Sequence, residues 1–464
     1  MRDQYHEQPI SSSFWIGRIF DVPNLDSGHQ SIKSISTDPA FAADCRKAAE
    51  WLAGALAEIG FSASVRDTIG HPMVVAHHDG PEGAPHVLFY GHYDVQPVDP
   101  IELWDSDPFA PTVTELSPGR KVITGRGTSD DKGQLMTFVE ACRAYKETHG
   151  ALPCRVSILF EGEEESGSIS LQPFLDANAE ELKADLALVC DTGMWDADTP
   201  SITVALRGLT GEEVTIKAAD CDLHSGHYGG NAANPIHVLT SILGEMHDAD
   251  GRVTIPHFYD GVHETPDHIK ADWEALGPPK GFLEDIGLSI PSGERDRSIL
   301  ERCWTRPTAE VNGITGGYTG EGFKTVIPAE ASAKVSFRLV GDQDPLAVRE
   351  NFRDFVKQRI PADCTAEFTE HGASGAIQLS FDAPEIGKAS AALEAEWGKP
   401  AAVIGMGGSI PIVGDFQSKL GMNSLLVGYA LEDDRIHSPN EKYDLRSFHK
   451  GVRSWIRILD ALTA

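Results

Sequence analysis

Features of membrane, secreted and nucleic-acid-binding proteins are missing from this sequence. No apolar run approaches the roughly 18 residues that a membrane-spanning helix needs. Residues 1–7 lack the basic start and apolar stretch of a secretory signal. The seven cysteines are scattered, odd in number and without paired spacing. They are therefore expected to be free thiols, as in the reducing cytoplasm.

Basic residues are scarce. The chain has 39 lysine and arginine residues against 70 aspartate and glutamate residues, which gives a net charge of −31. Such an average field repels polyanions, and no local basic patch is visible, so neither nucleic acid nor an anionic membrane is an expected partner. Most of this charge is explained by a solvated acidic surface and indicates no metal site by itself.

Two further absences narrow the class of protein. No Gly-X-Ser-X-Gly elbow follows a predicted strand, which argues against a serine hydrolase. No internal repeat or low-complexity tract is visible either. At 464 residues the chain is long enough for two or three globular domains.

The first part of the sequence alternates between strand and helix patterns. Apolar residues at helical spacing predict a helix over 44–59, and short apolar runs at 87–90, 156–160 and 186–190 predict buried strands. A further helix is expected to begin near Gly133. This alternation predicts a mostly parallel sheet with helices on both faces, an α/β fold.

The pattern changes after Arg207. Strands are expected at 214–216 and 333–340, and helices at 235–246 and 345–360, the latter with a proline at an early helical position. Two helices with a few mostly antiparallel strands indicate an inserted α+β domain, which we expect to be ferredoxin-like.

Toward the C-terminus the α/β pattern returns. A helix is expected over 389–397 and a strand at 425–427, before a terminal helix. We therefore expect one α/β domain formed by residues 1–206 and 377–464, interrupted by the insertion of residues 207–376.

Histidine and acidic residues follow two of the predicted strands. His92 and Asp94 come directly after the run 87–90. Residues two apart in a strand point to the same side, so this carboxylate can orient the imidazole; a hydrogen-bonded surface pair is the alternative. Asp191 ends the run 186–190 in the equivalent position. Open α/β sheets place their chemistry outside the carboxyl ends of such strands.

More carboxylates gather at a helix start and after the third strand. Asp130 and Asp131 precede the helix that begins near Gly133, where an aspartate either caps the helix or uses its two oxygens to bridge two cations. The glutamate triplet 163–165 is either a solvated loop or a site where one acid ligates a cation and its neighbour accepts a proton.

His437 lies far along the chain, in a loop motif at 436–441. Alone, such a histidine is more often simply exposed. Together with the other motifs it completes two imidazoles and three carboxylates, one of them bridging, so that each of two cations would have three protein ligands. Nitrogen and oxygen donors without cysteine suit zinc, manganese or cobalt, and coordination positions left open for water and substrate are typical of a catalytic centre.

Read in order, these motifs resemble the M20 family of metallopeptidases, which includes carnosinase-like dipeptidases, carboxypeptidase G and succinyl-diaminopimelate desuccinylase. The resemblance spans nearly the whole chain. It is carried by the motifs at 91–97, 125–133, 161–168, 223–226 and 436–441.

The resemblance implies two divalent metal ions per subunit, zinc before manganese or cobalt. His92, Asp130 and Asp191 would hold one ion, and Asp130, Glu165 and His437 the other, with Asp130 shared between them. A cis peptide bond would follow Asp130.

The resemblance also implies residues for the chemistry of amide hydrolysis. Glu164 would be the general base that takes a proton from the attacking water, and Asp94 the acid that orients His92. The Ser-Gly-Ser sequence at 166–168 sets this register and leaves Glu163 as the extra acid.

In the M20 family the insertion is a lid and dimerisation domain, so the resemblance implies a homodimer. His224 would reach the partner's active site and stabilise the oxyanion. Arg338 would hold a substrate carboxylate, which its planar fork suits. Gly408 and Ser409 belong to the segment that opens a helix beside the substrate.

Asp191 stands where other branches of the family carry glutamate, which resembles the dipeptidase branch. The expected function is therefore hydrolysis of a peptide bond in small peptides by a cytoplasmic metallodipeptidase. The alternative is an N-acyl-amino-acid amidohydrolase or a carboxypeptidase that uses the same site. A metal-binding protein without activity is disfavoured because every ligand position and the base position are filled.

Overall fold

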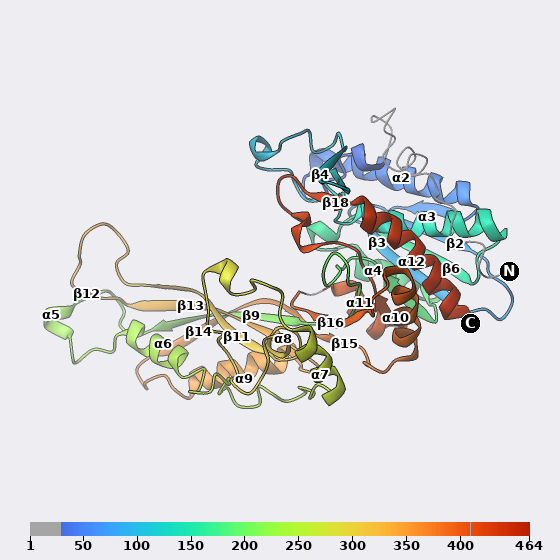
Figure 1. Cartoon of the computed structure of the whole chain (residues 1–464). Coiled ribbons are helices and arrows are strands. Elements are labelled where there is room, and N and C mark those ends of the chain that lie inside the picture. Colours follow the sequence, from blue (N-terminus) through green and yellow to red (C-terminus); the bar gives the residue numbers. More distant parts are fainter. Residues whose placement is uncertain (1–28, 409) are drawn as a thin grey trace. The chain divides into compact units, whose positions relative to one another are not determined.

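A computed structural model of the chain describes residues 29–408 and 410–464, and Figure 1 traces its helices and strands. No helix within these two ranges is both long and apolar enough to cross a bilayer. The seven cysteines all lie in the described part of the chain, and none forms a disulfide.

By their internal contacts the residues form two compact units. Among the described residues, the first comprises 29–203, 380–403 and 415–464, and the second comprises 204–379, 404–408 and 410–414. The segment 404–414 therefore groups with the second unit, although in the sequence it follows the insertion.

The first unit contains most strands of a nine-stranded sheet. The strands of this sheet are β1 (Ser62–Arg66), β2 (Met73–His78), β3 (His86–His92), β6 (Arg155–Glu161), β7 (Leu186–Val189), β8 (Ser201–Leu206), β15 (Ile377–Gln378), β16 (Ala402–Met406) and β17 (Asn423–Leu426), of which β15 and parts of β8 and β16 belong to the second unit. They are arranged in the order β1-β2-β6-β3-β7-β17-β8-β15, with β16 also paired to β8. The central strands β6, β3, β7 and β17 pair in parallel, and the pairs on either side of them are antiparallel. The predicted parallel arrangement thus holds at the centre of the sheet.

Helices cover both faces of this sheet (Figure 1). They are α2 (Ala42–Ile59), α3 (Lys132–His149), α4 (Leu171–Leu182), α10 (Pro384–Trp397), α11 (Pro411–Leu420) and α12 (Leu445–Thr463). Neighbouring residues of β3 point to opposite faces. The ring of Phe89 stacks on Phe138 of α3 with centroids 3.9 Å apart, whereas Tyr90 meets Phe416 of α11 at 6.0 Å. The parallel strands are therefore buried on both sides, as their continuous apolar runs predict.

The helix predicted over 44–59 shows how local sequence sets an element's bounds. In α2 the fully buried residues Ala48, Leu52 and Leu56 recur at helical spacing and face the sheet. The helix ends at Gly60, whose φ of 94° is a left-handed conformation that favours glycine.

The second unit has the β-α-β-β-α-β order of a ferredoxin-like fold. Its elements are β9 (Gly208–Lys217), α6 (Pro235–Gly244), β11 (Thr308–Gly316), β13 (Glu330–Leu339), α9 (Pro345–Lys357) and β14 (Thr365–Ser374). The strands form an antiparallel sheet in the order β11-β13-β9-β14. α6 and α9 contribute Ile242 and Phe352 to a core shared with Phe337 of β13. The α+β fold expected for the insertion is therefore confirmed.

Smaller elements complete both units. In the first unit, β4 (Thr112–Ser117), β5 (Arg120–Thr124) and β18 (Lys442–Asp444) form a three-stranded sheet. The second unit adds β10 (Leu223–His224), β12 (Val326–Ile327), α5 (Ser225–Tyr228), α7 (Asp267–Leu276) and α8 (Ile299–Trp304). Short 3₁₀ turns are η1 (His29–Ser31), η2 (Pro39–Phe41), η3 (Ile101–Leu103), η4 (Glu164–Ser166), η5 (Glu284–Ile286) and η6 (Glu432–Asp434).

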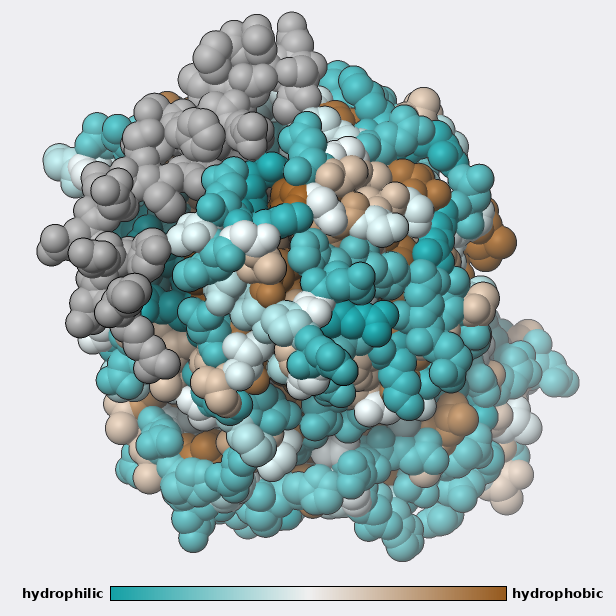
Figure 2. Space-filling view, turned by 90° about the vertical axis from the view of Figure 1, so that its right-hand side faces the viewer, coloured by the Kyte–Doolittle hydropathy of each residue, from teal (hydrophilic) through white to brown (hydrophobic). Residues whose placement is uncertain are grey.

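Hydrophilic residues dominate the surface that Figure 2 shows, and the apolar residues there are scattered in small patches. The face in this view is therefore mostly solvated.

Candidate metal centre

The parallel strands bring most of the predicted site residues to one edge of the sheet. His92 ends β3, the glutamate triplet follows β6, and Asp191 follows β7. β6, β3 and β7 are adjacent and parallel, so their carboxyl ends meet at the same edge. Asp130 precedes α3, and His437 lies between η6 and β18. All of these residues belong to the first unit.

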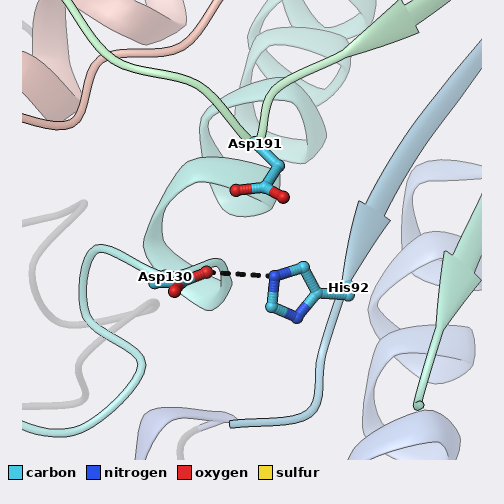
Figure 3. A group of neighbouring side chains, drawn as sticks. All are labelled: His92, Asp130 and Asp191. Atoms are coloured by element: carbon cyan, nitrogen blue, oxygen red, sulfur yellow. Dashed lines mark hydrogen bonds and ion pairs between the residues drawn. The ribbon is translucent and has the colours of Figure 1, made fainter. Parts of the chain in front are cut away.

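The first group of donor atoms consists of His92, Asp130 and Asp191. Figure 3 shows the three side chains pointing toward one another from β3, from the loop before α3 and from the end of β7. His92 Nε2 lies 3.0 Å from Asp130 Oδ1. One donor atom from each residue lies within 4.8 Å of the other two.

The second group consists of Asp130, Glu165 and His437. His437 Nε2 lies 2.9 Å from Asp130 Oδ2 and 3.2 Å from Glu165 Oε2. Asp130 therefore faces one imidazole with each of its two oxygens and belongs to both groups. The imidazole near the C-terminus does reach the strand-end residues, despite its distance along the chain.

The contacts around Asp130 shift the pKa values of several donor residues. Burial alone would raise the pKa of Asp130, but hydrogen bonds with His437 and His92 outweigh it and hold this pKa below its usual range. Hydrogen bonds to Asp130 and Glu165 raise the pKa of His437 to about 10. Burial, reinforced by the neighbouring Asp130 carboxylate, raises the pKa of Asp191 well above its ordinary value.

These donors fit divalent cations. They are nitrogen and oxygen atoms without a thiolate, the set that suits zinc, manganese or cobalt. Burial also raises the pKa of Glu164, so a further carboxyl group beside the donors resists ionisation. Asp130 is buried and Asp191 and Glu165 are half-buried, so an excess of carboxylates over imidazoles here is costly unless positive charge compensates it, and two cations would supply that charge.

The three glutamates of the triplet have different surroundings. The carboxylate of Glu163 accepts hydrogen bonds from the backbone N–H groups of His71 at 2.7 Å and Ser170 at 2.9 Å, so it holds two loops together. Glu165 faces His437. Glu164 makes neither of these contacts and stays half-buried beside the donor groups. This excludes a fully solvated loop as the interpretation of the triplet.

Asp94 is fully buried and connects the histidine to the glutamate turn. Its Oδ1 lies 3.4 Å from His92 Nδ1. Its carboxylate also accepts hydrogen bonds from the backbone N–H groups of Glu164 at 3.3 Å and Glu165 at 3.0 Å. The backbone carbonyl of Asp94 also lies 3.2 Å from His92 Nδ1. Asp94 therefore orients the imidazole through its carbonyl and its carboxylate, and the carboxylate also fixes the turn that carries two acids.

The loop before α3 does not use its aspartates to cap the helix. Asp131 occupies the N-cap position, but its side chain makes no capping hydrogen bond. It accepts instead from the backbone N–H of His92 at 3.1 Å and from the thiol of Cys190 at 3.3 Å. Burial raises the pKa of Asp131 to about 8. The Asp130–Asp131 peptide bond is cis, as the resemblance implies.

A third acidic group in the first unit carries its own cations. We call Asp433, Asp434 and Asp444 with Lys442 the lysine cluster. Lys442 Nζ lies 2.9, 2.5 and 3.5 Å from the three carboxylates in that order. Arg120 adds ion pairs of 2.8 Å to Asp433 and to Asp444. Two side-chain cations therefore compensate most of the charge of the three carboxylates without a metal ion.

The remaining predicted residues belong to the second unit. His224 is exposed on β10, and its Nδ1 accepts a backbone N–H two residues further on. Arg338 is half-buried on β13. Gly408 is exposed, and its carbonyl accepts the backbone N–H of Arg207 at 3.2 Å. Ser409 lies outside the described residues.

The structure also contains contacts that no sequence pattern indicates. Gln96 donates to Glu165 Oε2 at 2.7 Å, and the carboxylate of Glu441 is bonded to the loop that carries Asp130. Both residues stand inside the quoted motifs, which is the one signal that could have pointed to them.

Comparison with known proteins gives a family match over most of the chain. The model of peptidase family M20/M25/M40 matches residues 88–461. The Cys-Gly metallodipeptidase dug1 of Schizosaccharomyces pombe is 30% identical over 440 residues, which cover 91% of this chain and 91% of the yeast protein.

Solved structures agree with this match. The M20 family metallo-carboxypeptidase Sso-CP2 from Sulfolobus solfataricus has a TM-score of 0.77 and 29% identity, covering 96% of this chain and 99% of its own. Human carnosine dipeptidase 1 has a TM-score of 0.72 and 25% identity, covering 97% of both chains.

Proposed function

Since the chain belongs to peptidase family M20/M25/M40 and is a metal-dependent hydrolase, we propose that it is a dipeptidase that cleaves the peptide bond of small peptides. The resemblance seen in the sequence motifs is therefore confirmed at the level of the family. The observation that carries the proposal is the position of Asp130, whose two oxygens each face a histidine and join two donor groups beside Glu164.

In the proposed site, His92, Asp130 and Asp191 hold one divalent cation, and Asp130, Glu165 and His437 hold a second. When bound, such a pair of ions polarises a substrate oxygen and makes water acidic enough to act as a nucleophile near neutral pH. Zinc is our first choice for the native ion because the donors are imidazole and carboxylate, with manganese and cobalt as alternatives.

Glu164 acts as the general base. It takes a proton from the attacking water and passes it to the departing amine, which requires a carboxylate whose proton affinity lies near that of its partners. Burial raises the pKa of Glu164 and so favours this shuttle role. Asp94 supports the step from outside the reaction by fixing both the ring of His92 and the backbone of Glu164.

We assign the substrate-facing roles to the second unit and to the segment after β16. His224 stabilises the oxyanion in the partner subunit's site, Arg338 holds a substrate carboxylate, and Gly408 with Ser409 contacts the substrate backbone. This proposal makes the insertion of residues 207–376 a lid and dimerisation domain. Arginine suits the binding of a substrate carboxylate better than lysine, because its planar guanidinium can donate two parallel hydrogen bonds to the carboxylate.

A dipeptide with a free amine is our proposed substrate class. It is supported by the names of the relatives, which act on Cys-Gly or on carnosine. A carboxypeptidase or an N-acyl-amino-acid amidohydrolase is the second candidate, and the similarity to a metallo-carboxypeptidase structure favours it. Both reactions use the same donors and the same base, so the metal centre alone does not distinguish them.

We also propose that the protein is a cytoplasmic homodimer. Seven cysteines without a disulfide support a reducing compartment. The second unit ends its sheet at β11, an edge strand that exposes Val311 and Ile314 and offers an apolar surface to another copy.

One assay tests the substrate class and the metal requirement together. The purified protein is incubated with a panel of free dipeptides and with matching N-acyl amino acids, before chelation, after chelation and after addition of Zn²⁺, Mn²⁺ or Co²⁺. We expect free dipeptides to be cleaved, activity to disappear with the chelator and activity to return with the metal. Cleavage restricted to N-acyl amino acids or longer peptides would establish the second candidate, and activity that resists chelation would contradict both.

A further inference from the structure

Glu441 is a fully buried carboxylate that lies close to the metal centre without facing it. Its Oε2 accepts hydrogen bonds from Arg126 Nη1 at 2.7 Å and from the backbone N–H of Gly127 at 3.0 Å. Its Oε1 accepts from the backbone N–H groups of Ser129 at 2.9 Å and Asp130 at 3.1 Å. Every hydrogen bond to this side chain therefore comes from the short loop 126–130.

The two segments joined in this way supply the two residues that meet in the second donor group. Asp130 belongs to the loop 126–130, and His437 stands four residues before Glu441 in the other segment. The backbone adds to the junction, because the carbonyl of Glu441 accepts the N–H of Gly125 at 2.9 Å. Glu441 thus fixes the spacing between two chain segments that are more than 300 residues apart.

A second buried carboxylate reinforces the same junction. Asp434 accepts a hydrogen bond from the hydroxyl of Ser129 at 2.8 Å and from the backbone N–H of Leu431 at 2.8 Å. It is also paired with Lys442 at 2.5 Å. Asp434 is bonded to the side chain of Ser129 in this loop, whereas Glu441 accepts a hydrogen bond from the backbone N–H of Asp130 itself.

We propose that Glu441 is a positioning residue that sets the distance between Asp130 and His437 and so determines the affinity for the ion they share. The inference rests on the proposed function, in which these two residues ligate a common cation. Glu441 touches neither the cation nor the substrate. Its effect passes through the backbone of Asp130.

The hydrogen-bond pattern explains why only a carboxylate serves here. Each oxygen of Glu441 accepts two N–H donors, so the side chain uses four acceptor sites and no donor. A glutamine has the same shape, but its NH₂ group would face two N–H donors in either orientation. Glu441→Gln therefore loses two hydrogen bonds and brings donors against donors beside Asp130.

Arg126 provides a matched control, because it is the other half of the same buried ion pair. Arg126→Gln also breaks the 2.7 Å contact and leaves a buried carboxylate without its guanidinium. It does not remove the acceptor oxygens that hold Ser129 and Asp130. If Glu441 has a purely structural role, both variants should have the same Zn²⁺ affinity. If it positions Asp130, only Glu441→Gln should bind Zn²⁺ more weakly.

The experiment measures Zn²⁺ binding to the metal-free full-length protein by competition with a chromophoric chelator, together with the thermal midpoint. We expect both variants to lose stability. Glu441→Gln should also bind one of its two ions about 10- to 100-fold more weakly, the usual cost of removing a group that orients a ligand. Arg126→Gln should keep both affinities close to those of the wild type.

A milder variant covers the case in which Glu441→Gln does not fold. Ser129→Ala removes the hydroxyl that donates to Asp434 and should weaken the same ion by a smaller factor. Three results would overturn the inference. They are unchanged Zn²⁺ affinity in the folded Glu441→Gln protein, equal weakening in Arg126→Gln, and unchanged affinity in Ser129→Ala when Glu441→Gln is unfolded.

The test of Glu441 gives an answer whether or not the protein proves to be a dipeptidase. A wild-type protein that binds two ions but cleaves no peptide refutes the dipeptidase proposal, while the difference between Glu441→Gln and Arg126→Gln still supports the positioning role. A wild-type protein that binds no Zn²⁺ refutes both.

Discussion

Two acidic clusters of the first unit contain three carboxylates each but differ in the side chains that compensate their charge. In the donor groups around Asp130, carboxylates outnumber the two imidazoles, and burial raises the pKa of Asp191. In the lysine cluster, Lys442 contacts all three carboxylates and Arg120 contacts two of them. The donor groups around Asp130 have only imidazoles as partners, which carry charge only when protonated, whereas the lysine cluster has two partners that are charged at neutral pH.

This comparison shows that proximity of acidic side chains does not define a metal site. The three aspartates of the lysine cluster satisfy the same distance criterion as the donor groups. What separates the clusters is whether a side-chain cation already fills the space between the carboxylates. Carboxylates that face imidazoles rather than a lysine or an arginine are what make the centre around Asp130 suitable for divalent cations.

Removing the shared carboxylate is the strongest way to break the comparison. Asp130→Ala takes one donor from both groups, so we expect metal content to fall from two ions to none and turnover to fall by at least about 10⁴-fold, since metal ions supply several kcal/mol of transition-state stabilisation. Metal analysis and dipeptide turnover check this. Asp433→Ala, in the lysine cluster, is the control and should leave both unchanged. Full metal content in Asp130→Ala would show that the ions bind elsewhere.

Removing the ammonium group tests the other cluster. In Lys442→Met the buried carboxylate of Asp434 loses its cation, while Arg120 still pairs with the other two aspartates. We expect the free energy of unfolding to fall by about 3–5 kcal/mol, the usual cost of leaving one member of a buried ion pair alone. Urea denaturation measures this loss, and the double variant Lys442→Met/Asp434→Asn should recover part of it. A loss below about 1 kcal/mol, the range of an exposed pair, would mean that the cluster is solvated.

Glu164→Gln tests the donor groups around Asp130 more finely, because it distinguishes loss of the proposed general base from loss of a metal ligand. We expect turnover to fall by at least about 100-fold, the scale of general-base loss, while two ions stay bound. Glu163→Gln is the matched control from the same triplet. Its carboxylate holds two backbone N–H groups, so this variant should lose stability rather than turnover. Unchanged activity in a Glu164→Gln protein with two bound ions would remove Glu164 from the mechanism.

The smallest expected effect concerns the residue behind His92. Asp94→Asn keeps the shape of the side chain but weakens its hold on the imidazole and on the glutamate turn. We expect Zn²⁺ affinity to fall by about 10- to 100-fold, as for other groups that orient a metal ligand. Competition with a chelator measures it, with Asp79→Asn, an exposed carboxylate of the same unit, as the control. Equal affinities for the two variants would show that Asp94 has only a structural role.

Much of the fold follows from local sequence. The helix predicted over 44–59 lies in α2, the run at 156–160 lies in β6, and the run at 186–190 extends one residue beyond β7. The predicted ends of an element were less accurate where pairing with neighbouring strands determines its length. The strand expected at 214–216 is the end of the ten-residue β9, which pairs along its whole length with both neighbours. The first part of β9 contains two glycines and two glutamates, residue types that are depleted in strands.

The donor residues of the candidate site could also be found in the sequence, because their motifs stand at strand ends. Their surroundings could not. Sequence left open whether an aspartate caps α3, and the structure excludes a capping hydrogen bond from Asp131 because its carboxylate faces the N–H of His92. No pattern distinguishes Glu441 from any other acid near a histidine, since its role depends on a loop more than 300 residues away.

The sequence by itself determined the fold class, the family and the identities of the residues that resemble its metal ligands, because periodicity and short motifs are local properties of the chain. Only the tertiary structure decided which carboxylates form an ion pair with a lysine, which contact an imidazole and which accept hydrogen bonds from the backbone of a loop. These outcomes depend on distances between segments remote in sequence and on burial, and both of these set the electrostatic energy of a carboxylate.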